Sequence, residues 1–207
     1  MKQANIAVFV SGGGTNLQAL IDAEVRGDLH SGKIVLVVSS KTDVYALERA
    51  RCAGIPSVVV SRKSCADQTE FESRILAVLD EYRVDMIVLA GFLSILSADF
   101  TRRYPDRILN VHPSLIPAFC GQGFYGLRVH EAALARGVKL TGATVHFVNE
   151  IPDGGKIILQ KAVEVLPDDT PETLQRRVME QAEWLLLPAA AELVAKDLMK
   201  SANANKI

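Results

Sequence analysis

The stretch "NIAVFVSGGGTNLQALIDAEVRG", residues 5–27, joins a strand pattern to a helix pattern through three consecutive glycines. Residues 5–10 form an apolar run that is typical of a buried strand. Residues 15–27 carry apolar side chains at helical spacing, and Gly27 is a typical helix stop. This strand–loop–helix unit predicts the start of a βαβ repeat, from which parallel sheets are built.

The same alternation continues along the chain. Further strands are predicted at residues 33–40, 55–60, 85–91 and 107–111. Helices are predicted at residues 43–54, with Asp43 as a possible N-cap, at residues 66–84, and over a short stretch at residues 126–137. Strands that alternate with helices predict an α/β fold, in which a mostly parallel, twisted sheet is wrapped by helices in a Rossmann-like way.

The pattern changes near the C-terminal part of the chain. Residues 139–149 and 155–165 are strand-like and are joined by a very short link, which predicts an antiparallel strand pair. Residues 170–200 predict a helix with Thr170 as N-cap, Pro171 as first residue, and Pro188 as a kink or a break. We expect a single domain over residues 1–200 and a polar tail over residues 201–207.

The composition argues against several classes of protein. Lys plus Arg number 23 and Asp plus Glu number 24, which gives a net charge of −1. Nucleic-acid and membrane-surface binders usually carry a basic excess, so neither partner is expected. No apolar run reaches membrane-spanning length, and we expect a soluble, cytoplasmic protein. The three cysteines, Cys52, Cys65 and Cys120, match no metal motif and are predicted to be reduced thiols.

The glycine loop, residues 11–18, predicts a phosphate site. Glycines allow a close backbone approach, and a helix N-terminus offers free N–H groups and the positive end of a dipole. The loop has neither the lysine of a Walker A motif nor the G-x-G-x-x-G spacing of a dinucleotide site. A plain turn capped by Thr15 or Asn16 is the alternative interpretation.

Asn110 and His112 interrupt the apolar strand "ILNVH" at its carboxyl end, where ligands bind in open α/β sheets. Residues two apart on a strand point to the same side, so the amide and the imidazole should face one space. An amide can donate to a developing oxyanion, and a histidine can move a proton or share a charge. Asp153, in a turn before two glycines, is the best candidate for a supporting carboxylate. Turn and surface roles for all three residues remain open at this point.

The other histidines carry weaker signals. His30 lies in a polar loop and is expected to be solvated, and His130 is expected at the surface of the short helix. His146 lies on the strand before the Asp153 turn, on the same face as Thr144, where it could line the site or orient a partner residue.

Five sequence motifs together resemble one known family. "SGGGTNLQ", "VLAGFLSILS", "LNVHPSLIPAF", "GATVHFV" and "PDGGKIILQ", in this order, resemble the glycinamide ribonucleotide formyltransferases, which are folate-dependent enzymes of purine synthesis. The resemblance covers about residues 7–188. It implies formyl transfer from 10-formyltetrahydrofolate to the amine of glycinamide ribonucleotide, with no metal and no ATP.

The resemblance also implies roles for individual residues. Asn110, His112 and Asp153 would be the catalytic trio. The ribonucleotide and its phosphate would be held by Gly14, Thr15, Asn16 and Glu183, with Glu180 as the alternative to Glu183. The folate-binding residues would be Leu89, Leu93, Ser94, Ile95, Leu96, Asn110, Val148, Asn149 and Glu150. By the same resemblance, the bond between Ile116 and Pro117 would be cis.

Three departures from the family pattern stand out. Residues 120–134, "CGQGFYGLRVHEAAL", are longer than the "PGLHTH"-like form that is common in the family. Ser94 stands where an arginine is frequent. The stretch "MEQAEWLLLP" carries one extra residue around Glu183. The loop over residues 114–128 is expected to be a mobile lid, because it is long and glycine-rich.

Two alternative functions are considered beside the transferase. A formyltetrahydrofolate deformylase would use water in place of the amine, but it normally carries an additional N-terminal domain. A non-catalytic nucleotide-binding module would leave the trio without a role. The expected partners are the two small-molecule substrates, and both a monomer and a homodimer remain open.

Overall fold

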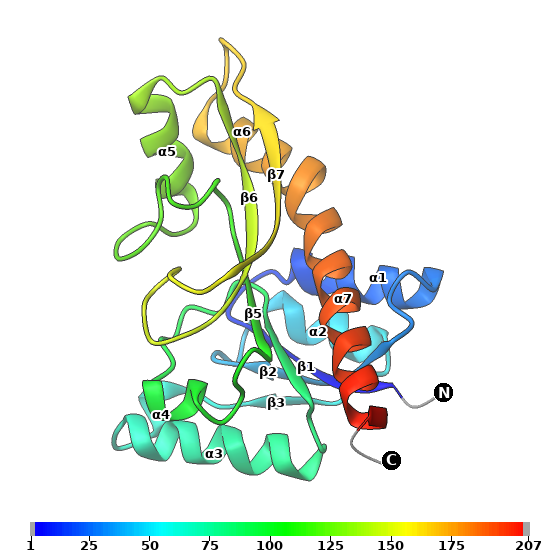
Figure 1. The fold of residues 1–207 in the computed structure, drawn as a ribbon. Helices are drawn as coiled ribbons and strands as arrows, with labels where there is room; N and C mark the ends of the chain where they lie inside the picture. The colour runs from blue at the N-terminus through cyan, green and yellow to red at the C-terminus, as the bar shows by residue number, and fades with distance from the viewer. Residues whose placement is uncertain (1–2, 205–207) are drawn as a thin grey trace.

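The computed structural model describes residues 3–204, with side chains to residue 201. Its seven-stranded sheet has the order β3-β2-β1-β4-β5-β6-β7 (Figure 1). The strands are β1 (Ala4–Val10), β2 (Gly32–Ser39), β3 (Ser57–Val59), β4 (Met86–Leu89), β5 (Ile108–His112), β6 (Leu140–Phe147) and β7 (Ile157–Glu164). The first five pair in parallel, whereas β6 and β7 run antiparallel to their neighbours. The predicted α/β fold class and the predicted antiparallel pair are confirmed.

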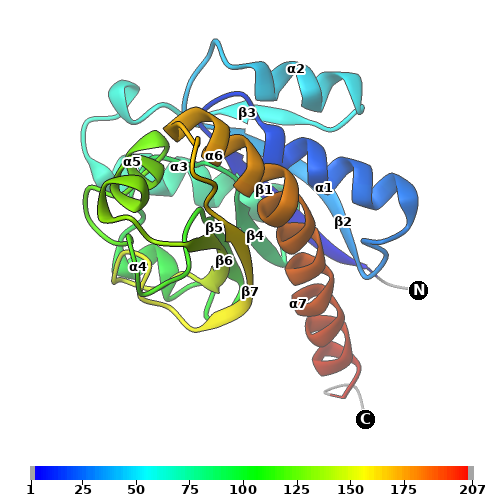
Figure 2. The same cartoon turned by 90° about the horizontal axis from the view of Figure 1, so that it is seen from above.

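Helices cover both faces of this sheet (Figures 1 and 2). They are α1 (Thr15–Arg26), α2 (Tyr45–Cys52), α3 (Gln68–Glu81), α4 (Ala98–Thr101), α5 (Leu127–Arg136), α6 (Pro171–Val178) and α7 (Trp184–Ala204), with a 3-10 turn at Arg62–Ser64 and a π turn at Met179–Glu183. One hydrophobic cluster includes side chains of α1, α2, α6 and α7, and a second includes side chains of α3 and α4. Each face of the sheet therefore has its own core, as a two-sided α/β fold requires.

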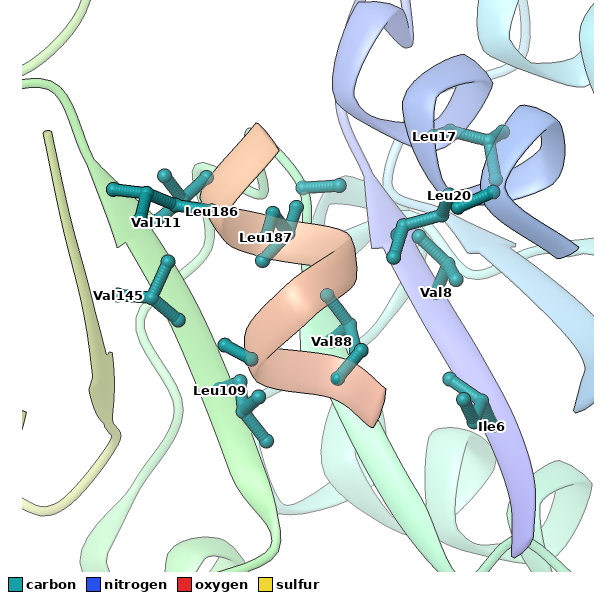
Figure 3. Close-up of a cluster of buried hydrophobic side chains, with 14 of the residues drawn as sticks. Ile6, Val8, Leu17, Leu20, Val88, Leu109, Val111, Val145, Leu186 and Leu187 are labelled. Atoms are coloured by element: carbon teal, nitrogen blue, oxygen red, sulfur yellow. The ribbon is translucent and has the colours of Figure 1, made fainter. Parts of the chain in front are cut away.

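The larger core lies under α7 (Figure 3). Leu186 and Leu187 of α7 lie over Val88, Leu109 and the other apolar side chains of the central strands. These side chains are at most 8% exposed, so the burial of each contributes roughly 1.5–3 kcal/mol to folding. This packing fixes the first turns of α7, and with them the π turn that precedes α7, near the carboxyl end of β5.

Of the two helix N-caps predicted from the sequence, the structure confirms one. Thr170 caps α6 through a reciprocal pair of hydrogen bonds with Thr173, as predicted. The prediction of Asp43 as an N-cap is wrong, because α2 begins at Tyr45 after the extended residue Val44.

The long C-terminal helix is interrupted, but not where the sequence indicated. Pro188 lies inside α7, and the α-helical pattern is broken instead by the π turn at Met179–Glu183. A π turn takes up one additional residue within a helix, and the sequence carries one extra residue in the same stretch. Within residues 3–204, no helix is both long and apolar enough to span a membrane.

Candidate active site

The end of β5 places Asn110 and His112 directly opposite His146 and Thr144 of β6. His112 is 5% exposed and His146 is 2% exposed, while Asn110 is partly open to solvent. Asn110 Nδ2 lies 3.2 Å from His146 Nε2. The two polar residues of β5 therefore face one space, as the two-residue spacing predicted, and His146 lines it with them.

Asp153 completes this group from the loop between β6 and β7. Its Oδ2 lies 3.5 Å from His112 Nδ1, and its Oδ1 lies 3.5 Å from His146 Nε2. Asp153 has a φ of 54°, a left-handed conformation that Asp adopts more readily than most residues. The structure thus brings together the three residues that the sequence analysis grouped.

The surroundings of Asp153 favour its charged form. Burial opposes ionisation, but a hydrogen bond with His146, a backbone hydrogen bond from Gly121 and the nearby imidazole of His112 together hold the pKa of Asp153 below its usual value. The site therefore holds an ionised carboxylate between two imidazoles at neutral pH.

The hydrogen bonds of His146 define its hydrogen positions. Its Nδ1 lies 2.8 Å from the carbonyl oxygen of Phe147, which can only accept, so Nδ1 carries a hydrogen. In the neutral ring Nε2 then accepts from Asn110 Nδ2, whereas in the protonated ring Nε2 carries a hydrogen and donates to Asp153 Oδ1 instead. Since that amide nitrogen has two hydrogens, one stays free for a ligand.

His130 differs from the prediction. It was expected at the surface, but it is fully buried on α5, beside Val129 and Ala133. Burial and the neighbouring His112 lower the pKa of His130 to about 4, so it is neutral at physiological pH. His130 lies on the apolar stripe of α5, because Ala133 and Leu134 follow it by three and four positions. This spacing was the signal that could have revealed its burial. His30, by contrast, is exposed as expected.

The glycine loop ends at the N-terminus of α1. Gly14 is the N-cap residue with a φ of 73°, no side chain caps the helix, and its first turn contains no acidic residue. The capping role considered for Thr15 or Asn16 is therefore wrong. The first N–H groups of α1 have no helical acceptor, and their dipole favours an anion.

Asn16 and Glu183 meet behind this loop. Asn16 Nδ2 donates to Glu183 Oε2 at 2.7 Å, and both side chains are buried. Burial raises the pKa of Glu183, and the hydrogen bond from Asn16 offsets part of that rise. Glu180 is exposed and lies three positions before Glu183 in the same π turn.

Sequence reasoning missed Arg49. Its Nε donates to the carbonyl of Gly13 at 2.9 Å, its Nη1 donates to Gln18 at 2.9 Å, and its guanidinium lies over the ring of Tyr45. It helps to line a hollow of about 330 Å³ together with Thr15, Glu180 and Trp184. A rigidly held cation beside an uncapped helix N-terminus increases the attraction for an anion. No local signal reveals Arg49, since it is distant in sequence from the loop.

The residues predicted to form the folate pocket differ in how deeply they are buried. Leu89 and Leu96 are each 7% exposed and belong to the core, whereas Leu93 and Ile95 are 61% and 78% exposed. Val148 packs against the same core cluster as Leu89 and Leu96. Asn149 and Ser94 are partly exposed, and Glu150 is exposed. The exposed apolar side chains, not the core leucines, are the ones available to a ligand.

The segment after His112 is braced against β6. Thr144 Oγ1 donates to the carbonyl of Ser114 at 2.7 Å and accepts from the N–H of Ile116 at 3.1 Å. Gln160 Nε2 donates to the same hydroxyl and to the carbonyl of Ile116. The bond between Ile116 and Pro117 is cis, as predicted.

No cluster of three or more potential metal ligands occurs in the described part of the chain. The three cysteines Cys52, Cys65 and Cys120 are free thiols.

Comparison with known proteins connects this geometry to a family. The family model described as "Formyl transferase" matches residues 4–190. A phosphoribosylglycinamide formyltransferase of Haemophilus influenzae is 44% identical over 183 residues, which cover 88% of this chain and 83% of that protein. The trifunctional purine biosynthetic protein adenosine-3 of Homo sapiens is 45% identical over 206 residues. The chain spans about a fifth of that longer relative's length, at 20%.

Solved structures agree with the sequence relatives. Glycinamide ribonucleotide transformylase 1 from Symbiobacterium toebii superimposes with a TM-score of 0.88 at 40% identity, covering 94% of this chain and 89% of that chain. The family match spans nearly the whole sheet and includes Asn110, His112 and Asp153. The chain therefore belongs to the formyl transferase family.

Proposed function

We propose that this chain transfers the formyl group of 10-formyltetrahydrofolate to the amine of glycinamide ribonucleotide, a step of purine biosynthesis. The observation that carries the proposal is the convergence of Asn110, His112, His146 and Asp153 at the sheet edge that also carries the glycine loop. Relatives of closely similar length are named for this reaction.

The reaction forms a bond between the amine nitrogen and the formyl carbon. The formyl oxygen becomes an oxyanion, and the bond to the folate nitrogen then breaks. Asn110 is placed to donate its free amide hydrogen to that oxyanion, because its other hydrogen is directed to His146. Such a donor typically contributes about a hundredfold or more in rate.

A proton has to travel from the attacking amine to the leaving folate nitrogen. His112 and Asp153 provide groups that can hold it, since their nitrogen and oxygen atoms lie 3.5 Å apart. The ionised Asp153 supports an imidazolium at His112, which also favours the oxyanion. His146 orients both Asn110 and Asp153 and is a positioning residue in this scheme.

The ribonucleotide phosphate is assigned to the N-terminus of α1, at Gly14, Thr15 and Asn16. The uncapped first turn and the adjacent Arg49 support this assignment. Glu183 lies beside Asn16 and is the acid we assign to the ribonucleotide, in agreement with its contact at 2.7 Å. Glu180, which lines the hollow with Thr15, remains the alternative.

The folate is assigned to the surface between residues 89–96 and residues 148–153. Leu93 and Ile95 offer exposed apolar area for a flat aromatic ring system. Ser94, Val148, Asn149 and Glu150 would border the same surface. Leu89 and Leu96 would support it from the core.

A turnover assay tests the proposed reaction. Consumption of 10-formyltetrahydrofolate is followed by absorbance, with and without glycinamide ribonucleotide. The transferase predicts turnover that depends on the ribonucleotide and yields formylglycinamide ribonucleotide. Equal consumption without ribonucleotide would instead identify a deformylase, and ribonucleotide binding without turnover would identify a binding module.

The proposal also covers the domain organisation, the oligomeric state and the cellular location of the chain. A single domain over residues 1–200 agrees with one continuous sheet. The chain would act as a monomer or a homodimer. A cytoplasmic location agrees with the free thiols, because reducing compartments keep cysteines reduced.

A further inference from the structure

The backbone of Phe119–Gly121 contacts two members of the catalytic trio. His112 Nε2 lies 2.8 Å from the carbonyl oxygen of Phe119, and the N–H of Gly121 donates to Asp153 Oδ2 at 2.8 Å. Only Cys120 separates the two backbone groups. Both bonds are shorter than the 3.5 Å contact between His112 and Asp153 themselves.

The Phe119 carbonyl determines which nitrogen of His112 carries a hydrogen. A carbonyl can only accept, so Nε2 must donate. The neutral ring then presents the lone pair of Nδ1 to Asp153, and a second hydrogen on Nδ1 would satisfy that carboxylate. The carbonyl therefore leaves Nδ1 as the nitrogen of His112 that faces Asp153.

The Gly121 N–H acts on the carboxylate. A hydrogen bond to the charged form of an acid stabilises that form, and the backbone bond from Gly121 is one of the causes that lower the pKa of Asp153. The other titratable groups near Asp153 are His112, His146 and Cys120, whose pKa is raised by burial and by Asp153 itself. His130, on α5, is the remaining titratable neighbour of His112.

The loop is folded to present these two groups. Phe119 and Gly121 have φ values of 49° and 86°, so the chain reverses locally on either side of Cys120. Ser114 Oγ donates to the carbonyl of Ala118 at 2.6 Å, and the ring of Phe119 packs edge-on against Phe124. This is the same segment in which the sequence departs from the common family form.

We propose that the Phe119 carbonyl and the Gly121 N–H are positioning groups for the reaction, which orient His112 and Asp153 and set where their protons lie. The proposal rests on the proposed function and gives the loop a role beyond that of a lid. Because the groups belong to the backbone, a change of the intervening Cys120 side chain would leave them in place.

Backbone esters test the proposal atom by atom. Cell-free translation with glycolic acid in place of Gly121 removes the N–H that faces Asp153 and also converts the Cys120 carbonyl to an ester. Lactic acid in place of Cys120 converts the Phe119 carbonyl to an ester, a weaker acceptor, and Cys120→Ala is its amide control. Glycolic acid in place of Gly123 is the matched ester control, since the Gly123 N–H has no protein acceptor among residues 3–204.

The expected results are specific for each ester. Without the Gly121 N–H, the carbon-13 titration of the Asp153 carboxyl and the acid limb of kcat/KM both move to higher pH, and kcat/KM falls about tenfold. With the ester at position 120, nitrogen-15 spectra of the neutral His112 ring show the hydrogen shared between Nε2 and Nδ1. The Gly123 ester and Cys120→Ala match the wild type in both measurements.

Two outcomes would overturn the proposal. One is an Asp153 titration that is unchanged in the Gly121 ester, and the other is a wild-type His112 whose neutral ring carries its hydrogen on Nδ1. Both spectra are recorded on the substrate-free protein. A failure of the proposed reaction is therefore seen separately, as an absence of ribonucleotide-dependent turnover in the wild type.

Discussion

Asn16 donates a hydrogen bond of 2.7 Å to Glu183, which lies 167 positions further along the chain. The contact joins the first turn of α1 to the π turn before α7, and it is buried on both sides. Asn16 Oδ1 is also buried and has no hydrogen-bond donor among the described residues. Burial raises the pKa of Glu183, so this acid takes up a hydrogen more readily than an exposed glutamate does.

Glu183→Gln should change stability in a pH-dependent way. A raised folded-state pKa stabilises the protein below the ordinary value of 4.5, and this contribution is lost as the pH rises. Glutamine stays neutral and can still accept from Asn16. We therefore expect the unfolding free energy of Glu183→Gln to exceed that of the wild type at about pH 8, by on the order of 1 kcal/mol, and the gap to close toward about pH 4.5.

Urea unfolding across this pH range measures the effect, with the exposed Glu180 changed to Gln as the control. Glu183→Ala should cost about 1–3 kcal/mol at every pH, because it leaves the Asn16 amide without an acceptor. A constant difference between Glu183→Gln and the wild type would contradict the raised pKa of Glu183.

Gly14→Ala should destabilise the fold. A Cβ at Gly14 would lie 2.7 Å from Ala46 Cβ and 2.9 Å from its Cα, and Gly14 has a φ of 73°. The left-handed conformation alone costs an alanine roughly 1–2 kcal/mol, and the collision adds to this. Gly12→Ala is the control, since a Cβ there meets nothing within 4 Å. Thermal unfolding should separate the two variants clearly, and equal midpoints would refute the close approach.

Asn110→Ala should lose about a hundredfold in kcat, the usual cost of one oxyanion donor. His112→Ala should lose a similar factor through the missing proton carrier.

His146→Ala should cost about tenfold, since His146 acts through Asn110 and Asp153. In the double variant of Asn110 and His146 the losses should not add, because one side chain orients the other. Additive losses, or near-wild-type turnover in Asn110→Ala, would mean that the assigned roles are wrong.

The parts of the fold that the sequence predicted are those with local causes. The alternation of apolar strands with amphipathic helices predicted the α/β class, and the short "EIPDG" link predicted the antiparallel pair. The proximity of Asn110 and His112 follows from strand geometry alone.

The remaining features depend on tertiary contacts. Arg49 reaches the carbonyl of Gly13 across 36 positions, and no local pattern encodes that approach. The contacts of Phe119 and Gly121 use backbone atoms, so residue types do not reveal them. The extra residue before Glu183 was visible, but its placement in a π turn depends on how α7 packs on the sheet.

Ser11 links the glycine loop to the segment that we assign to the folate. Its Oγ accepts from the N–H of Leu93 at 3.0 Å and shares a hydrogen with Ser40 Oγ at 2.6 Å. Ser11 is 3% exposed and begins the glycine loop, while Leu93 lies in the segment assigned to the folate. The hydroxyl therefore fixes the start of the glycine loop against the segment around Leu93.

Ser11→Ala should weaken folate binding more than ribonucleotide binding. The variant leaves the Leu93 N–H without its acceptor, while the N–H groups at the start of α1 stay in place. One hydrogen bond of this kind contributes about 0.5–1.5 kcal/mol, which corresponds to a rise of roughly three- to tenfold in the KM for 10-formyltetrahydrofolate. Ser40→Ala is the matched control, because it removes the outer partner but keeps the bond from Leu93 to Ser11. Steady-state titration of each substrate at saturating levels of the other separates the two effects. If Ser40→Ala raised the folate KM as much as Ser11→Ala, the link through Leu93 would not be what positions the folate segment.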